Sequence, residues 1–286
     1  MRSPALLLCS VFACLGMLGP CAAAAPQADK PLPDPHQLMQ DVFAHQKQLD
    51  KIRETYTYTT EMTTQDLNGD GAVTKTELEE FEVFFVNGHE IARLIKKDGK
   101  PLDAHDEEKE SARVSKLVEK AEKTPSGQSI DGGENISISR VLEIMDVSAA
   151  RREQFRGRPT IVFDFAGRKD AKAHGLAEEA SKKLKGTIWI DEADREVAHL
   201  EVTFYDNFHV GGGLVANVQK GSNFRFDQAP VDGGLWLPTG AEGTMKARVL
   251  LLKNMRQHFT VHNSDYKRFS VDAQQIKDAK TVTSKP

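Results

Sequence analysis

The sequence predicts an α+β fold in which a curved antiparallel β-sheet, a half-barrel, is capped by helices. Most segments after residue 155 alternate apolar and polar residues with a period of two, as strands with one buried face do. Short turn-forming segments separate these strands, and short turns join antiparallel neighbours. Helical periodicity is confined to a few segments, without repeated β–α–β units, so strands and helices are segregated along the chain.

The N-terminus predicts export. Residues 1–24 combine a positive charge, an apolar run and a small-residue end, which is the order of a signal peptide, and residues 25–34 form a leader. Pro20 disfavours lipid anchoring at Cys21. The mature chain then contains no thiol, because all three cysteines precede the cleavage site: Cys9, Cys14 and Cys21. We expect a periplasmic or secreted protein that does not span a membrane.

Helical periodicity predicts two long helices and two short ones. The first covers residues 35–54, where Asp34 caps the helix and Pro35 occupies its first turn. The second is a charged segment over residues 104–123, capped by Asp103, with a thin apolar stripe. Shorter helices are expected at residues 139–147 and 171–184.

The strands are predicted from β-branched and aromatic residues that alternate between turn signals. They cover residues 56–63, 81–86, 91–95, 160–165, 186–191, 196–205, 223–228, 234–238, 244–252 and 258–263. The whole domain runs from residue 35 to residue 273, and the polar tail, residues 274–286, is expected to be flexible.

Residues 66–77 match the ligand pattern of an EF-hand calcium loop. The matching positions are Asp66, Asn68, Asp70, Ala72, Thr74 and Glu77. The preceding segment is rich in threonine and tyrosine and favours a strand over the helix that an EF-hand requires. Asparagine and glycine between two strands are also a hairpin signal. We favour a hairpin turn and keep a calcium site as the alternative.

Other chemistry is not indicated. The sequence has no nucleophile elbow, no phosphate-binding loop and no dinucleotide fingerprint. The formal net charge of −4 gives no reason to expect a nucleic-acid partner. We therefore expect a protein that is not an enzyme and has no cofactor apart from possible Ca²⁺.

Four stretches together resemble a known family: "FRGRPTIVFDF", "KLKGTIWIDEADREVAHLEV", "GLWLPTGAEGTMKARVLLLK" and "SDYKRFSVD". They resemble secreted proteins of the outer-membrane lipoprotein-sorting-like family, which are relatives of the LolA and LolB carriers and of the regulator RseB. The resemblance covers most of residues 35–272. It implies a helix-capped half-barrel whose apolar cavity receives acyl chains. The charged segment 104–123 departs from the compact carriers.

The resemblance implies a carrier or sensor that binds lipid or a lipidated protein. The aromatic residues expected to line such a cavity are Trp189, Phe204, Phe224, Phe226, Trp236 and Phe259. For each of them, ordinary packing in the sheet core is the alternative. A calcium-binding module and an envelope scaffold that binds another protein are the competing functions.

Overall fold

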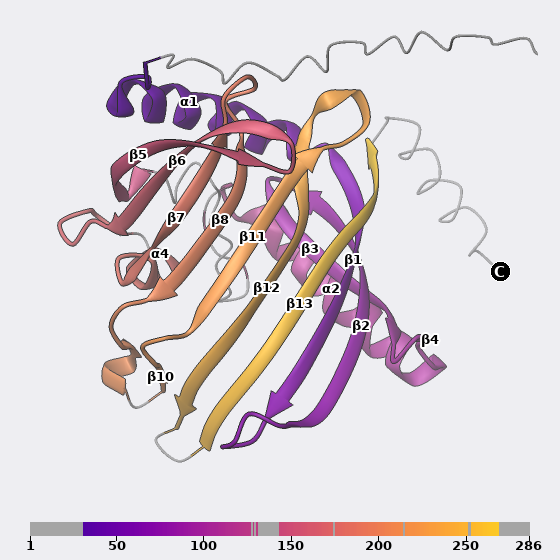
Figure 1. Ribbon diagram of the computed structural model, residues 1–286. Coiled ribbons are helices and arrows are strands. Elements are labelled where there is room, and N and C mark those ends of the chain that lie inside the picture. Colours follow the sequence, from indigo (N-terminus) through magenta and orange to yellow (C-terminus); the bar gives the residue numbers. More distant parts are fainter. Residues whose placement is uncertain are drawn as a thin grey trace, which may run out of the picture. The chain divides into compact units, whose positions relative to one another are not determined.

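The computed structural model describes residues 31–126, 128, 130, 143–173, 175–213, 215–250 and 253–268 (Figure 1). All of these except Pro31 belong to one compact unit, Leu32–Pro286. The predicted signal peptide and the predicted tail lie outside the described residues, and so does the leader apart from residues 31–34.

The described unit is built on one antiparallel sheet. Its strands follow the order β4-β3-β2-β1-β13-β12-β11-β8-β7-β6-β5, and β10 pairs with β12 and β9. Their bounds are β1 (Tyr56–Leu67), β2 (Val73–Val86), β3 (His89–Lys97), β4 (Lys100–Pro101), β5 (Met145–Phe155), β6 (Arg158–Gly167), β7 (Leu184–Asp191), β8 (Val197–Phe204), β9 (Phe208–Val210), β10 (Ala216–Val218), β11 (Asn223–Pro230), β12 (Trp236–Val249) and β13 (Lys253–Arg268). Within the described ranges, no ladder joins β4 to β5, so the sheet is open.

The two long helices form where the sequence predicts them. Helix α1 (Pro35–Arg53) begins after Asp34, whose side chain accepts a hydrogen bond from the Gln37 N–H. Helix α2 (Ala104–Lys123) begins after Asp103, which accepts from two N–H groups of the first turn. These caps satisfy donors that lack a partner inside the helix, so the local sequence fixes both starting points.

Each long helix contacts a different half of the sheet. Leu38 and Val42 of α1 belong to a buried cluster with Ile161, Phe163 and other residues of β6, β7 and β8. Helix α2 lies behind β1, β2 and β3 in Figure 1 and contacts β2 and β3. The α+β class and the antiparallel sheet are therefore confirmed.

Two short helix predictions are corrected. The predicted helix over residues 139–147 is wrong at Met145–Val147, which belongs to β5 and pairs with β6; residues 139–142 lie outside the described part of the chain. The predicted helix over residues 171–184 is shorter: α4 covers Leu176–Ser181, and Leu184 already begins β7. In both places, pairing with an adjacent strand of the sheet overrides the local helical pattern.

The strands near the C-terminus are longer than predicted. The segments 234–238 and 244–252 are joined in one strand, β12, which ends at Val249, and residues 251–252 are not described. Gly240, which the sequence suggests as a turn, lies inside β12. A Cβ atom there would come within 2.7 Å of the Val261 carbonyl oxygen. This glycine permits close strand approach and does not end the strand.

Candidate functional site

The strand register brings four of the predicted lining residues to one face of the sheet. Phe204 pairs with Leu184, and Phe224 and Phe226 pair with Val202 and Leu200 of β8. Paired residues of an antiparallel ladder point to the same side. Gly243 of β12 pairs with both Phe224 and Phe259, so Phe259 also belongs to this side.

This side continues the buried core into a half-buried surface. We use the name apolar face for Val202, Phe224, Phe226, Phe259, Val261 and Met62, which the ladders place on the same side of β8, β11, β13 and β1. Val202 is buried within the core cluster, and Phe224 packs against that cluster. The remaining members are partly exposed, and nearby Met245 is 37% exposed.

Small residues of β12 separate two rows of large side chains on the apolar face. Ala241 lies between Phe226 and Val261 in the ladder, and Gly243 lies between Phe224 and Phe259. A Cβ atom on Gly243 would come within 2.8 Å of the Phe224 Cβ atom. The middle strand therefore contributes little side-chain bulk between the two rows.

Trp189 does not belong to the apolar face. It pairs with His199, one residue out of phase with the apolar positions of β7 and β8. Its indole ring lies 4.9 Å from the His199 ring and 6.0 Å from the Phe155 ring, centroid to centroid. The indole Nε1–H donates to Glu153 Oε2 at 3.2 Å. Trp189 is therefore part of an aromatic cluster on the opposite side of the sheet.

Trp236 is held at the beginning of β12. Its side chain is 3% exposed, and its Nε1–H donates to Asp194 Oδ2 at 3.1 Å. The Arg158 guanidinium lies 5.5 Å from the centroid of its ring and pairs with Asp194 at 2.6 Å. These contacts give the indole N–H a hydrogen-bond acceptor and bury the ring. Trp236 therefore packs in the sheet core, which is the alternative role considered for it.

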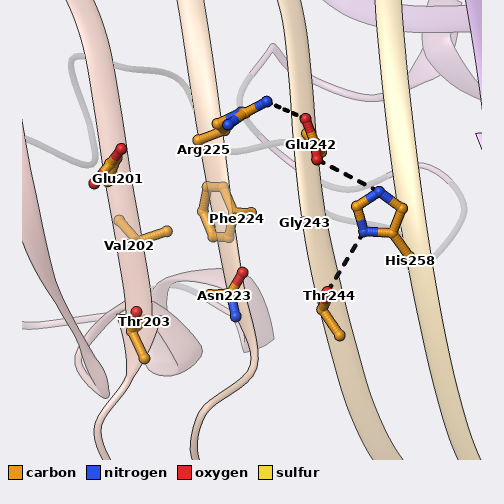
Figure 2. Close-up of a pocket in the computed structure, with 10 residues that line it drawn as sticks. All are labelled: Glu201, Val202, Thr203, Asn223, Phe224, Arg225, Glu242, Gly243, Thr244 and His258. Carbon is orange, nitrogen blue, oxygen red and sulfur yellow. Dashed lines mark hydrogen bonds and ion pairs between the residues drawn. The ribbon is translucent and has the colours of Figure 1, made fainter. Parts of the chain in front are cut away.

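Figure 2 shows a hollow lined mainly by polar side chains. Its charged residues Glu201, Arg225 and Glu242 pair with one another in the ladders and share the side of the sheet that carries His199 and Trp189. The hollow has a volume of about 280 Å³ and crosses β8, β11, β12 and β13. Glu242 forms an ion pair with Arg225 and lies 3.4 Å from His258 Nε2. The Thr244 hydroxyl lies 3.5 Å from His258 Nδ1. Four of the lining side chains, Arg225, Glu242, Thr244 and His258, are thus joined across neighbouring strands.

His199 lies on the same polar side of the sheet, and contacts with Phe155 and Asp227 fix its ring. Its ring stacks on Phe155 at 4.9 Å, and its Nδ1 lies 2.7 Å from Asp227 Oδ1. Burial alone raises the pKa of Asp227, but the hydrogen bond from His199 and the nearby arginine charges outweigh it and hold that pKa below its usual value. Asp227 is therefore an ionised partner that fixes the His199 ring.

The calcium-like segment is a hairpin turn between β1 and β2. The Asn68 side-chain oxygen accepts hydrogen bonds from the N–H groups of Asp70 at 3.0 Å and Ala72 at 2.9 Å. The Ala72 carbonyl accepts from the Asn68 N–H at 2.9 Å, and Gly71 has a φ of 86°. The strand–turn–strand prediction is confirmed, because these bonds build the turn from its own backbone.

Three further EF-hand positions, Asp66, Thr74 and Glu77, also have partners within the sheet. Asp66 Oδ1 accepts from the Gln257 side chain at 2.8 Å, and the Thr74 hydroxyl donates to the Asp66 carbonyl at 3.1 Å. Glu77 pairs with Lys75 at 2.6 Å. Across the described ranges, no group of three or more His, Cys, Asp or Glu side chains is arranged to hold a metal ion.

Sequence reasoning missed several members of the apolar face. Met62 and Val261 are paired with each other across β1 and β13. The period-two alternation of both strands contains this signal, but alternation alone does not say which strands are neighbours. The contact between His45 of α1 and Glu196 has no sequence signal, since the two residues are 151 positions apart.

The chain is similar to several solved structures over most of its length. A DUF1329 family protein from Desulfovibrio piger has 14% identity and a TM-score of 0.38, over 84% of this chain and 99% of that one. An outer membrane lipoprotein-sorting protein domain from Vibrio parahaemolyticus has 13% identity and a TM-score of 0.34, over 79% and 90%. The Pseudomonas aeruginosa MucA/MucB complex gives 10% identity and a TM-score of 0.23, over 81% and 100%.

One of these structures, that from Vibrio parahaemolyticus, bears the description of an outer membrane lipoprotein-sorting protein domain. No protein-family description matches the chain, and no curated protein matches it. Among the helices in the described ranges, none is both long and apolar enough to cross a membrane.

Proposed function

We propose that this protein is a non-enzymatic carrier or sensor, periplasmic or secreted, that binds the acyl chains of a lipid or lipidated protein. In this proposal residues 1–24 direct export, and the curved sheet with its helices forms a half-barrel around the ligand. The observation on which it rests is the apolar face, which extends the buried core across β11, β12, β13 and β1 without becoming fully buried.

The arrangement of the apolar face suits an extended hydrocarbon chain. Two rows of large side chains flank the small residues Ala241 and Gly243 of β12. An acyl chain lying along β12 would contact both rows. Each methylene transferred from water to such a surface contributes about 0.8 kcal/mol, so one long chain supplies enough free energy for useful binding.

The direct test is to identify what the protein holds. Protein purified from an envelope fraction is expected to release fatty acyl species that mass spectrometry detects, and emptied protein is expected to take up a fluorescent fatty acid. Protein that is repeatedly empty and takes up no fluorescent fatty acid would refute the proposal.

A matched pair of variants tests the face itself. Val261 and Thr260 are adjacent in β13 and point to opposite sides of the sheet, Val261 toward the apolar face. Val261→Lys is expected to weaken fatty acid binding more than about tenfold, because losing contact with two methylenes already costs about 1.6 kcal/mol. Thr260→Lys places the same charge on the polar side and is expected to bind as the wild type does. Equal affinities for the two variants would contradict a site on the apolar face.

A further inference from the structure

A buried carboxylate joins α1 to the sheet. Glu196 directly precedes β8 and is 2% exposed. Its Oε1 lies 2.9 Å from His45 Nε2, and its Oε2 accepts a hydrogen bond from the Gln46 side chain. Both partners come from α1. Because a buried carboxylate is costly without partners, the position of the helix and the charge of Glu196 depend on each other.

The contact extends through a polar cluster that we call the α1 cluster: His45, Gln46, Arg53, Glu196 and Gln228. The Arg53 guanidinium donates to Gln46 Oε1 at 3.2 Å and to Gln228 Oε1 at 2.8 Å. The Gln228 side chain, 1% exposed, donates to the Val197 carbonyl at 2.7 Å. Gln46 therefore links the Glu196 end of the cluster to the Arg53 end.

The charges around Glu196 come from both sides of the interface. On α1 they are His45, Asp50 and Arg53, of which Arg53 pairs with Asp50 at 2.8 Å. On the sheet side, Arg195 precedes Glu196. Asp191 donates its N–H to the Glu196 carbonyl, while its carboxylate is paired with Arg158. The Asp50 and Asp191 carboxylates thus have arginine partners of their own.

His45 is the member of the cluster through which protons can enter. Its side chain is 40% exposed, whereas that of Glu196 is 3% exposed. Burial raises the pKa of Glu196 above its ordinary value, against the opposing influence of Gln46 and His45. A proton on Glu196 removes the need to bury an uncompensated anion between helix and sheet.

We propose that the docking of α1 on the sheet is proton-linked, with a proton on the Glu196 carboxyl holding the helix in place. When that proton is lost, Glu196 becomes a buried anion beneath α1, and the helix loosens. A carboxyl group whose pKa is raised in the docked state stabilises docking fully below the ordinary glutamate pKa. That stabilisation is lost as the pH rises from about 4.3 through the raised value.

Hydrogen exchange of α1 amides in the full chain measures this linkage. After correction for the intrinsic exchange rate, wild-type protection in residues 38–49 is expected to fall with rising pH, by up to about tenfold per pH unit for one linked proton. Glu196→Gln keeps the shape and hydrogen-bonding capacity without the charge, so its protection is expected to be independent of pH. Glu201→Gln, an exposed change in β8, is the matched control and should retain the wild-type slope.

Two results would overturn the proposal: wild-type protection that does not change with pH, or a wild-type slope in Glu196→Gln. The first needs no variant and stands even if Glu196→Gln fails to fold. His45→Gln provides a further check, because His45 opposes the raised pKa of Glu196. Without His45 the pKa of Glu196 rises further, so α1 is expected to loosen at a higher pH than in the wild type, and loosening at the same or a lower pH would also overturn the proposal.

Discussion

Gly186 offers a sharp test of the central strand packing. It lies in β7, where it pairs with Val202 of β8 and Phe165 of β6. A Cβ atom at this position would lie 1.8 Å from the Glu201 carbonyl oxygen and 3.0 Å from the Phe165 ring. Gly186→Ala therefore forces β7 and β8 apart or shifts a buried aromatic ring.

The expected cost follows from that geometry. Ordinary contact needs more than about 3 Å, so the strands must separate by about 1 Å, which takes ladder hydrogen bonds beyond their working range. Losing such bonds costs about 0.5–1.5 kcal/mol each, and overpacking a core adds about 1–3 kcal/mol. We expect Gly186→Ala to lower the free energy of unfolding by about 2–5 kcal/mol.

Urea unfolding followed by tryptophan fluorescence measures the effect, since Trp189 lies in the same strand. Gly69→Ala is the matched control. Gly69 lies in the exposed hairpin turn, and a Cβ atom there would meet nothing within 4 Å. It is expected to change stability by no more than about 1 kcal/mol. A Gly186→Ala protein as stable as Gly69→Ala would refute the packing of β7 against β8.

Three further predictions concern the hairpin and α2. Asn68→Ala removes the acceptor of two turn hydrogen bonds and is expected to cost about 1 kcal/mol of stability, measured by thermal unfolding. Calorimetric titration with calcium is expected to show no binding heat, because the Asn68 side-chain oxygen and the Ala72 carbonyl already accept hydrogen bonds within the turn. Binding heat that is present in the wild type and lost in Asp70→Ala would restore the calcium alternative. Glu110 accepts from Arg113 and from the Leu94 N–H, and Arg113 lowers its pKa. The stability from Glu110 is thus present above the ordinary glutamate pKa and lost as pH falls below it. Glu110→Gln should have a lower free energy of unfolding than the wild type at pH 7, and the difference between the two should shrink as the pH is lowered. A difference that does not change with pH would show that the Glu110 charge plays no part.

Local signals were enough for the elements whose partners are near in sequence. The Asp34 and Asp103 caps fix where α1 and α2 begin, and the turn around Asn68 and Gly71 is built from its own residues. Local signals failed where pairing with another strand decides. Met145–Val147 has a helical pattern, but it pairs with β6 and becomes part of an edge strand.

The candidate site divides in the same way. Alternation indicates that Phe224, Phe226 and Phe259 each point to an apolar side of their own strand. It does not reveal that Trp189 points to the other side of the sheet, because its phase depends on the register between β7 and β8. Nor does it reveal Met62, which joins the apolar face through the pairing of β1 with β13.

The sequence by itself therefore determined the class of fold, the long helices and the hairpin, since caps, turns and periodicity act within a few residues of the chain. Tertiary structure alone decided which strands are neighbours, which aromatic residues share a face and how Glu196 meets His45 beneath α1. The pairing of β1 with β13 and the contact of Glu196 with His45 join residues more than a hundred positions apart, and burial rewards such contacts only once the whole sheet has assembled.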